Sequence, residues 1–456
     1  MSVAVEPRIQ PRSVTESELR ARLLERVPGA KTPSEASLEL RRRIPSEIDD
    51  WWLNARAANS GPIDVIDMFS GCGGMSAGFR LVNAMVPAFR QIAAIDVDTA
   101  ANRTFEANLG LVPSNVDVHK LAHEPELLDN LLRSSGRRPG APLVLIGCSP
   151  CQGFSSHRNK AGETDTRNLL FVDFARIAAR LQPDFVIMEN VPELLTERYW
   201  PVFEAAREIL RAAGYHLHLS VHNMAEFGVP QERFRALVLA SREPFEPLGG
   251  VLSREHFRTV RQAIGKLKPI EAGEVDPADP MHLTATHRES TIATIRSIPH
   301  NGGSRSLSQG PESLRLLHAR QGKAAYEDVY GRLAWDRPSI TITAYSRNPA
   351  SGRFSHPEQD RGLSVREAAL LQGFPRSYQF DGSFDERFRQ IGNAVPPMFG
   401  AHLGLSVIAQ LAEKPGSFPS EGIREPVAKS FSRLIPSLKA GSLRLANVTH
   451  GSGLPA

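Results

Sequence analysis

Two cysteines and one glutamate occupy positions where an α/β enzyme would carry reactive groups. Cys148 and Cys151 follow the apolar run 143–147, and the loop that leaves the carboxyl end of a parallel strand is the usual place for an active site. Glu189 ends a second apolar run, 184–188, where an unpaired carboxylate would be costly. We therefore expect Glu189 to be hydrogen-bonded or functional. The alternative for the cysteines is that both are small, buried side chains in a turn.

Two arginines follow further along the chain, within the sequence Gln-Glu-Arg-Phe-Arg at 231–235. Arg233 and Arg235 are two positions apart at the start of an apolar run, so as strand residues they would point to the same face. A solvated strand edge is the alternative interpretation of such a pair.

A glycine-rich turn follows the first apolar run, with the sequence Asp-Met-Phe-Ser-Gly-Cys-Gly-Gly at 67–74. Glycines let the backbone approach a ligand closely, and the helix that follows presents free N–H groups. The turn matches neither the phosphate loop nor the GxGxxG pattern, which argues against ATP and NAD and leaves room for S-adenosylmethionine. Asp96 ends the second run, where it could accept hydrogen bonds from ribose hydroxyls. Asp117 follows a predicted third strand and could contact adenine.

Short apolar runs alternate with helical patterns between residues 63 and 240. The runs are apolar at consecutive positions, as in parallel strands that are covered on both faces. This rhythm predicts an α/β fold with a doubly wound, Rossmann-like sheet. The predicted strands are 63–69, 91–98, 143–150, 184–190 and 235–240, with helices at 169–181 and 200–213 between them.

The alternation of apolar runs and helical patterns ends near residue 243. Residues 243–330 are rich in proline, glycine, histidine and charge without a sustained period, which predicts a separate, irregular module. A β-branched strand at 337–345 and helices at 364–372 and 396–411 are expected after it.

These changes of character divide the chain into five parts. We expect a helical extension over 1–60, with helices at 16–26 and 34–43, and a cofactor-binding catalytic domain over 61–242. A smaller recognition domain over 243–350 and a part completing the catalytic domain over 351–414 follow. Residues 415–456, with several Pro, Gly and Ser residues, are expected to form a flexible tail.

The composition is that of a soluble globular protein, with 41% hydrophobic and 23% charged residues. No run approaches the roughly 18 apolar residues of a membrane span, and the N-terminal residues lack the apolar core of a secretory signal. Three cysteines cannot form a disulfide framework, which favours a cytoplasmic location, and no four Cys or His residues stand at zinc spacing. The net charge of +4 permits a polyanionic partner without requiring one.

Six motifs in a fixed order resemble the DNA cytosine-5 methyltransferase family, in its bacterial restriction–modification or orphan form. They are Asp-x-Phe-Ser-Gly-x-Gly-Gly (67–74), Pro-Cys-Gln (150–152), Glu-Asn-Val (189–191), Gln-x-Arg-x-Arg (231–235), RGLSVREAALLQGFP (361–375) and QIGNAVPP (390–397). The resemblance covers about residues 63–412 and is interrupted only by 243–330.

The resemblance implies a covalent mechanism. The Cys151 thiolate would add to carbon 6 of cytosine, so that carbon 5 becomes able to attack the methyl group of S-adenosylmethionine. Glu189 would hold N3 and the exocyclic amine of the base. Arg233 and Arg235 would lie beside the base, where one could bind its carbonyl and both lower the thiol pKa. Cys148 and Cys72 match no catalytic position, so a structural role is expected for both.

The resemblance also assigns cofactor-binding positions. Phe69 and the turn Ser70-Gly71-Cys72-Gly73-Gly74 would cradle the cofactor, and Asp96 would bind the ribose, where the family more often has Glu. The remaining positions implied are Val97 packing against adenine, Asp117 accepting its amine, and Asn393 and Val395 closing over the methionine end.

DNA is the implied substrate, with the target cytosine flipped out of the duplex. Residues 243–330 occupy the place of the family's recognition region, where Arg305 is a candidate to read guanine. Thr341 and Thr343, with Ser346 and Arg347, would contact the DNA backbone. Gln152 and Ser155 on the nucleophile loop are further candidates. A short recognition site, a monomer on double-stranded DNA and a possible cognate restriction endonuclease complete the expectation.

Three alternatives stay open. A branch of the same family methylates cytosine in transfer RNA, although the developed insert at 243–330 favours DNA. A catalytically silent DNA-binding regulator could use the same scaffold, but the intact Cys151, Glu189, Arg233, Arg235 and Asn393 argue against it. Residues 1–60 could either pack on the main domain or form a small DNA-binding or dimerising appendage.

Overall fold

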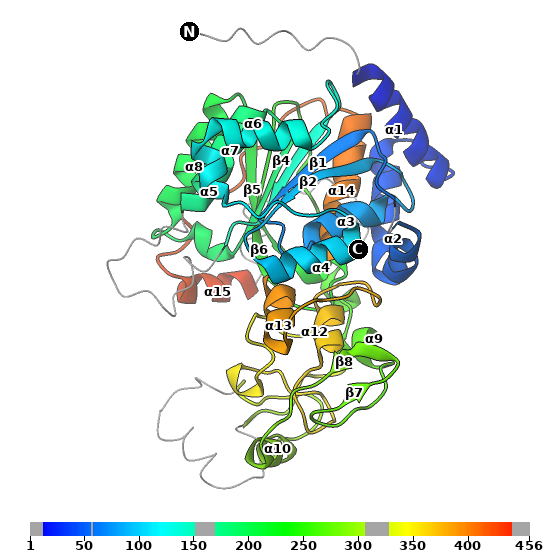
Figure 1. The fold of residues 1–456 in the computed structure, drawn as a ribbon, viewed down its shortest axis with the longest axis vertical. Helices are drawn as coiled ribbons and strands as arrows, with labels where there is room; N and C mark the ends of the chain where they lie inside the picture. Colours follow the sequence, from blue (N-terminus) through cyan, green and yellow to red (C-terminus); the bar gives the residue numbers. More distant parts are fainter. Residues whose placement is uncertain (1–11, 56–57, 151–168, 306–327, 440–456) are drawn as a thin grey trace.

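A computed structural model describes residues 12–55, 58–150, 169–305 and 328–439 (Figure 1). Its centre is a six-stranded sheet with the order β2-β1-β3-β4-β6-β5. The first four strands in this order pair in parallel, whereas β6 runs antiparallel to both of its neighbours. The strands are β1 (Ile63–Met68), β2 (Phe89–Ile95), β3 (Leu143–Gly147), β4 (Phe185–Asn190), β5 (His216–Asn223) and β6 (Phe234–Ser241).

Helices cover both faces of the sheet, which is why its strands are apolar at consecutive positions. On β1, Val65 packs into one core and Ile66 into the other, as alternate strand residues must. One face carries α5 (Val118–His123), α6 (Pro125–Ser134), α7 (Leu169–Leu181) and α8 (Trp200–Ala212) (Figure 1). The other carries α1 (Arg12–Arg26), α2 (Pro33–Ala55), α3 (Gly74–Val82), α4 (Thr99–Leu109) and α14 (Pro397–Ala412). The predicted doubly wound α/β fold is confirmed.

Several predicted elements differ from the structure. No strand precedes Asp117, because the segment before it makes only an isolated bridge between Ser114 and Ile95. Strand β5 was not predicted: it lies at the sheet edge, where its polar side chains at alternate positions break an apolar run. The expected parallel course of 235–240 is wrong, since β6 returns antiparallel between β4 and β5.

The β-branched run 337–345 is also not a strand. Its backbone makes one isolated bridge, from Ser339 to Gln231, and then bonds to side chains instead of a ladder. The Ile342 amide donates to Oε1 of Gln231 at 2.8 Å, and the Ile342 carbonyl accepts from Arg233 at 3.1 Å. Strand propensity was therefore overridden by polar side chains that satisfy the same backbone groups.

The second lobe comprises the described residues between 254 and 372 and hangs below the sheet in Figure 1. Up to residue 305 its described part is largely irregular, as the sequence predicts for residues 243–330. Its elements are η5 (Arg254–His256), α9 (Val260–Ile264), β7 (Val275–Asp276), β8 (Asp279–Leu283), α10 (Glu289–Arg296), η7 (Pro349–Ser351) and α12 (Val365–Leu371). Beyond it, α13 (Phe384–Asn393) leads back to α14.

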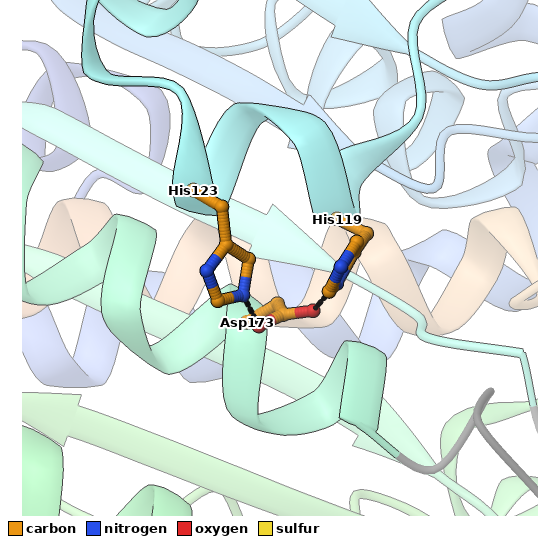
Figure 2. A group of neighbouring side chains, drawn as sticks. All are labelled: His119, His123 and Asp173. Carbon is orange, nitrogen blue, oxygen red and sulfur yellow. Dashed lines mark hydrogen bonds and ion pairs between the residues drawn. The ribbon is translucent and has the colours of Figure 1, made fainter.

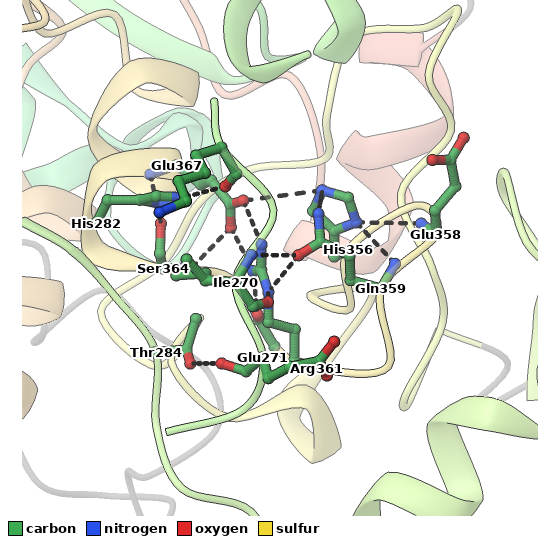
Figure 3. A network of polar contacts seen from close by, with 12 residues as sticks. Ile270, Glu271, His282, Thr284, His356, Glu358, Gln359, Arg361, Ser364 and Glu367 are labelled. Carbon is green, nitrogen blue, oxygen red and sulfur yellow. Dashed lines mark hydrogen bonds and ion pairs between the residues drawn. The ribbon is translucent and has the colours of Figure 1, made fainter. Parts of the chain in front are cut away.

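A buried polar network holds this lobe together (Figure 3). Arg361 makes two hydrogen bonds of 2.8 Å to the carboxylate of Glu367, and both side chains are almost fully buried. Glu367 also caps α12 through the backbone of Ser364, whose hydroxyl bonds to His282 of β8. A lobe with little regular structure thus gains its order from fully paired polar groups.

The flexible tail predicted over 415–456 does not begin at residue 415. Ile423 bonds to β5, and α15 (Phe431–Lys439) buries Leu434 and Leu438 in the core beside η3 (Pro192–Leu195). Two leucines four positions apart form one apolar helix face, a signal that the proline- and serine-rich composition obscured. Residues 440–456 lie outside the described part.

The N-terminal helices pack on the main domain, where Ser37 donates to the Leu405 carbonyl of α14. The described residues include one helical stretch, 384–412, that is long and apolar enough to cross a membrane. Within it, 78% of the apolar window is buried inside the protein, because α14 packs against α2 and α3. Core packing accounts for its apolar character. The short η4 (Met224–Phe227) joins β5 to the segment before β6.

Candidate active site

A cavity of about 450 Å³ lies at the carboxyl ends of β1 to β4. It collects groups that are up to 328 positions apart in the sequence, from Asp67 to Val395, as expected at this edge of a parallel sheet. Of the predicted site residues, those that line it are Phe69, Ser70, Gly71, Asp96, Val97, Asp117, Glu189, Arg233, Arg235, Asn393 and Val395, with Gly74.

The glycine-rich turn forms one wall through its backbone conformation. Phe69, Gly71 and Gly73 all have positive φ angles, of 60°, 50° and 87°. Gly74 permits a close approach: a Cβ atom there would lie 2.2 Å from the Val395 carbonyl. Gly73 does not line the cavity. It precedes α3 in the left-handed conformation, so its role is to turn the chain.

Asp96 holds this turn from the next strand. Its Oδ2 accepts the Gly71 amide at 2.7 Å, and its Oδ1 accepts the Asp98 amide at 2.8 Å. Burial raises the pKa of Asp96, and the hydrogen bonds donated by the two backbone amides oppose that rise. Each carboxylate oxygen keeps further lone pairs, so Asp96 can accept hydrogen bonds from a ligand in the cavity.

Asp117 and Val97 stand on the same wall. The Asp117 side chain caps α5 by accepting the His119 amide at 2.8 Å, a contact that fixes its direction. Val97 is 61% exposed, unusual for a large apolar side chain next to a cavity. Asn393, at the end of α13, also lines the cavity and is exposed.

Glu189 lies at the centre of the chemical part of the site. Its Oε1 is 2.9 Å from Nε of Arg235, and its Oε2 accepts from the Cys148 thiol at 2.7 Å. The carboxylate is 2% exposed, and the paired Arg235 explains how a charge can be buried there. The expectation that Glu189 is hydrogen-bonded is therefore confirmed.

The contact between Cys148 and Glu189 was not predicted from the sequence. The register of β3 and β4 pairs Gly147 with Met188, so the residues that follow each partner face one another beyond the strand ends. This juxtaposition could have been inferred once both strands were known to be neighbours. Cys148 lines the cavity, as Cys72 does, and differs from it in contacting Glu189.

Arg233 has different partners from Arg235, although both line the cavity. Its guanidinium donates to the carbonyls of Ile342 and Gly392 at 3.1 Å, and to that of Ala394 at 3.5 Å. It is buried and joins three chain segments. The geometry therefore gives Arg233 a bracing role and leaves Arg235 as the arginine at the carboxylate.

The loop that carries Cys151, Gln152 and Ser155 lies outside the described residues. Its approach is described as far as Pro150. Before it, the Ser149 hydroxyl accepts a hydrogen bond of 2.9 Å from the Asn190 side chain at the end of β4. Cys148, Ser149 and Pro150 line the cavity.

Cys72 is buried, and burial raises the pKa of its thiol well above the usual range. It contacts the Gln390 carbonyl at 3.6 Å. A thiol of this kind is unreactive, in keeping with the structural role expected for it.

The predicted DNA-contacting residues that are described do not line the cavity. Thr341 donates to the Glu232 carbonyl at 3.0 Å, and Thr343 accepts the Tyr345 amide at 3.3 Å. Arg347 pairs with Asp385 at 3.0 Å. Arg305 is half-buried, and among the described residues its Nε has no hydrogen-bond partner.

This α/β sheet, with a glycine-rich turn and a buried carboxylate at its carboxyl edge, is the fold of a methyltransferase. A crystal structure of a prophage-encoded E. coli protein described as a DNA modification methyltransferase shares it, with a TM-score of 0.53 and 24% identity. The match covers 77% of this chain and 100% of that one.

The chain belongs to the C-5 cytosine-specific DNA methylase family, whose model matches residues 63–409. It is 36% identical over 354 residues to the type II methylase M.HgiDII of Herpetosiphon aurantiacus, covering 75% of this chain and 94% of the relative. It is 34% identical over 348 residues to the type II methyltransferase M1.HphI of Haemophilus parahaemolyticus, covering 75% and 86%. The predicted family and enzyme class are confirmed.

Proposed function

We propose that this enzyme transfers a methyl group from S-adenosylmethionine to carbon 5 of a cytosine in double-stranded DNA. The observation that carries the proposal is Glu189, buried at the cavity and held by Arg235, one strand away from the Pro-Cys-Gln loop. Family membership supplies the reaction type and the DNA substrate.

The cavity has features that fit S-adenosylmethionine. Gly74 allows backbone to approach backbone where a side chain would collide, and Asp96 offers unused lone pairs for hydroxyl groups. The Ser70 hydroxyl is buried and has no hydrogen-bond partner among the described residues, so a ligand could satisfy it. Exposed Val97 offers an apolar surface to adenine. When bound, S-adenosylmethionine supplies an electrophilic methyl group.

In the proposed reaction the protein's residues act on the base. The Cys151 thiolate adds to carbon 6, and Glu189 holds N3 and the exocyclic amine as charge develops on the ring. Arg235 keeps the carboxylate oriented. The Cys148 thiol is only a weak donor to Oε2 of Glu189, so this oxygen can also accept a hydrogen bond from the amine of the base. Loss of the carbon 5 proton and elimination of Cys151 then restore the aromatic ring.

Carbon 5 of a stacked, paired cytosine is out of reach of the active site, so the base must rotate out of the duplex at a cost of a few kcal/mol. We assign residues 243–350 to target recognition, with Arg305 as the leading candidate for a contact to guanine. Gln152, Ser155, Thr341 and Thr343 are proposed to contact DNA beside the flipped nucleotide. The type II names of the relatives favour a restriction–modification role with a cognate endonuclease in a bacterial cytoplasm.

Covalent trapping on duplex DNA that contains 5-fluorocytosine tests the mechanism, because fluorine blocks release of the enzyme. We expect the wild-type protein to be trapped, Cys151→Ser to lose trapping completely while still binding DNA, and Cys148→Ser to keep it. Serine at position 148 preserves a hydroxyl donor to Glu189, so that variant is the matched control. Trapping of Cys151→Ser, or loss of trapping only in Cys148→Ser, would exclude Cys151 as the nucleophile.

The RNA alternative is tested with the same protein by comparing methyl transfer to duplex DNA and to transfer RNA. Methylation of RNA alone would overturn the proposed substrate while leaving the covalent chemistry intact. Bisulfite sequencing of DNA from cells that express the enzyme would then give the recognition sequence.

A further inference from the structure

We propose that His119, His123 and Asp173 form a binding site for a divalent transition-metal ion of the zinc, cobalt or nickel class (Figure 2). The two histidines lie one turn apart on α5, and Asp173 lies on α7, which packs against it. One potential ligand atom from each residue lies within 4.8 Å of the others. A zinc-type spacing motif in the sequence cannot reveal this group, because Asp173 is about 50 positions from the histidines and joins them only in the fold.

The distances suit an ion that takes imidazole nitrogen and carboxylate oxygen. Nδ1 of His119 is 2.7 Å from Oδ2 of Asp173, and Nε2 of His123 is 3.1 Å from Oδ1. Bonds of about 2.0–2.1 Å in a tetrahedral site place ligand atoms about 3.3 Å apart. Each separation between an imidazole nitrogen and a carboxylate oxygen therefore lies within about 0.6 Å of the tetrahedral value. Two imidazoles and one carboxylate leave an open position for water or a fourth ligand.

Burial separates the roles of the three side chains. The Asp173 carboxylate has no exposed surface, whereas the side chains of His119 and His123 are about half exposed, at 53% and 47%. A buried carboxylate needs a cation or strong donors to offset its desolvation. The histidines leave that cation a path from solvent. The cluster is thus closed at its anionic end and open at its imidazole end.

Arg176 now supplies the positive charge. Its Nη1 donates to Oδ1 of Asp173 at 2.7 Å and lies 3.2 Å from Nε2 of His123. Nε2 cannot satisfy both neighbours, since it must donate to a carboxylate and accept from a guanidinium. A metal ion removes this conflict by using the nitrogen lone pair. The Arg176 side chain is 45% exposed, so it can move into solvent when the ion enters.

The site adjoins the active-site cavity without being part of it. Asp117 and Val118 at the start of α5 line that cavity, as does Leu170 of α7. A bound ion would join these two helices and stabilise the wall that they share. Binding to the folded state alone also raises stability by mass action. The inference does not depend on the proposed methylation reaction.

Titration with Co²⁺ tests the site, using the full-length protein without a histidine tag and stripped of metals. Calorimetry should show binding of a single ion, with visible absorption bands of cobalt in a low-symmetry site. His119→Gln and His123→Gln should each weaken binding by at least about 10-fold, the smallest loss expected even for a supporting group. Both side chains are half exposed, so these variants should keep the fold, as circular dichroism can verify.

Two further variants make the test decisive. Arg176→Gln removes the competing cation and should tighten Co²⁺ binding, whereas a purely structural network would only be weakened by that change. His256→Gln is the control. His256 lies 3.8 Å from the carboxylate of Glu255, but within the described part of the chain it belongs to no group of three potential metal ligands, so this variant should bind Co²⁺ as the wild type does. The proposal is overturned if Co²⁺ does not bind, if Arg176→Gln fails to strengthen binding, or if the bound ion shows thiolate charge-transfer bands that persist in both histidine variants.

Discussion

Two fully buried carboxyl groups, one in the sheet and one in the second lobe, have opposite ionisation behaviour. Burial raises the pKa of Asp67 on β1 to about 8, nearby Asp96 adds to the rise, and the Ser76 hydroxyl opposes it. Burial also acts to raise the pKa of Glu367, yet the charge and hydrogen bonds of Arg361 outweigh it and lower the value to about 2. At neutral pH, Asp67 is mostly protonated and Glu367 is ionised.

The difference shows that the available partner, rather than burial, decides the state of a carboxyl group. Asp67, at the cavity end of β1, accepts a hydrogen bond from the Ser76 hydroxyl, and among the described residues no arginine or lysine pairs with it. The second lobe instead contains three arginines that are fully buried and paired, Arg332, Arg361 and Arg366. A buried carboxyl group is therefore ionised where an arginine reaches it, as at Glu367, and mostly protonated where a hydroxyl is its hydrogen-bond donor, as at Asp67.

Of the substitutions that test this contrast, Arg361→Leu should cause the largest loss in the free energy of unfolding. It leaves the Glu367 carboxylate buried without its cation, and breaking a buried pair in this way costs about 3–5 kcal/mol. Urea unfolding at pH 7 measures the loss. Hydrogen exchange should locate it in peptides that cover residues 353–372.

The same variant has a pH dependence with a defined sign. Glu367 has a folded pKa below its unfolded value of 4.5, so its contribution is complete above pH 4.5 and is lost as the pH falls toward 2. The cost of Arg361→Leu should therefore shrink in acid. The double variant Arg361→Leu, Glu367→Leu should recover much of the loss, since well-packed apolar pairs can replace buried ion pairs. An equal loss in the single and double variants would contradict the charge-pair explanation.

The sequence predicts the sheet region well because apolar periodicity is a local signal. Helix α7 was predicted with the bounds that the structure shows, and four of the five predicted strands are parallel strands whose ends lie within three residues of the predicted ones. The second lobe offers no such signal. Arg361 and Glu367 are both charged residues in a helix-start motif, and nothing local indicates that they are buried against one another.

The candidate site divides in the same way. Positions at strand ends, such as Asp96 and Glu189, follow from the predicted sheet and from the resemblance. Their partners do not: the contact between Glu189 and Cys148 depends on the register of β3 and β4, and the carbonyls braced by Arg233 come from segments more than 100 positions away. Local pattern thus indicates which residues reach the site, while tertiary contacts decide what each one does there.

Asp67→Asn should cause the second-largest change in the free energy of unfolding, and the stability of the variant relative to the wild type should increase with pH. The folded pKa of Asp67 is raised to about 8 from 3.8, so its contribution is complete below pH 3.8 and is lost as the pH rises toward 8. Asparagine keeps a similar shape and cannot ionise. Between pH 5.5 and 7.5 the wild type should lose about 2.7 kcal/mol relative to the variant, at 1.36 kcal/mol per pH unit. Urea unfolding at both pH values measures this; parallel pH profiles would show that Asp67 is ionised in the folded protein.

Ser76→Ala should have the smallest effect and the most informative pH dependence. The Ser76 hydroxyl donates to the Asp67 carboxyl group, and removing it should raise the pKa of Asp67 further. A neutral hydrogen bond contributes about 0.5–1.5 kcal/mol and one to a charged group about 1.5–3 kcal/mol, so the cost should be larger at pH 9 than at pH 6.5. Ser37→Ala is the matched control, because that buried hydroxyl donates to a carbonyl that cannot ionise, and its cost should not change with pH. If the cost of both serine variants were independent of pH, Asp67 would not titrate in this range. The ionisation of Asp67 and Glu367 would then not differ in the way proposed.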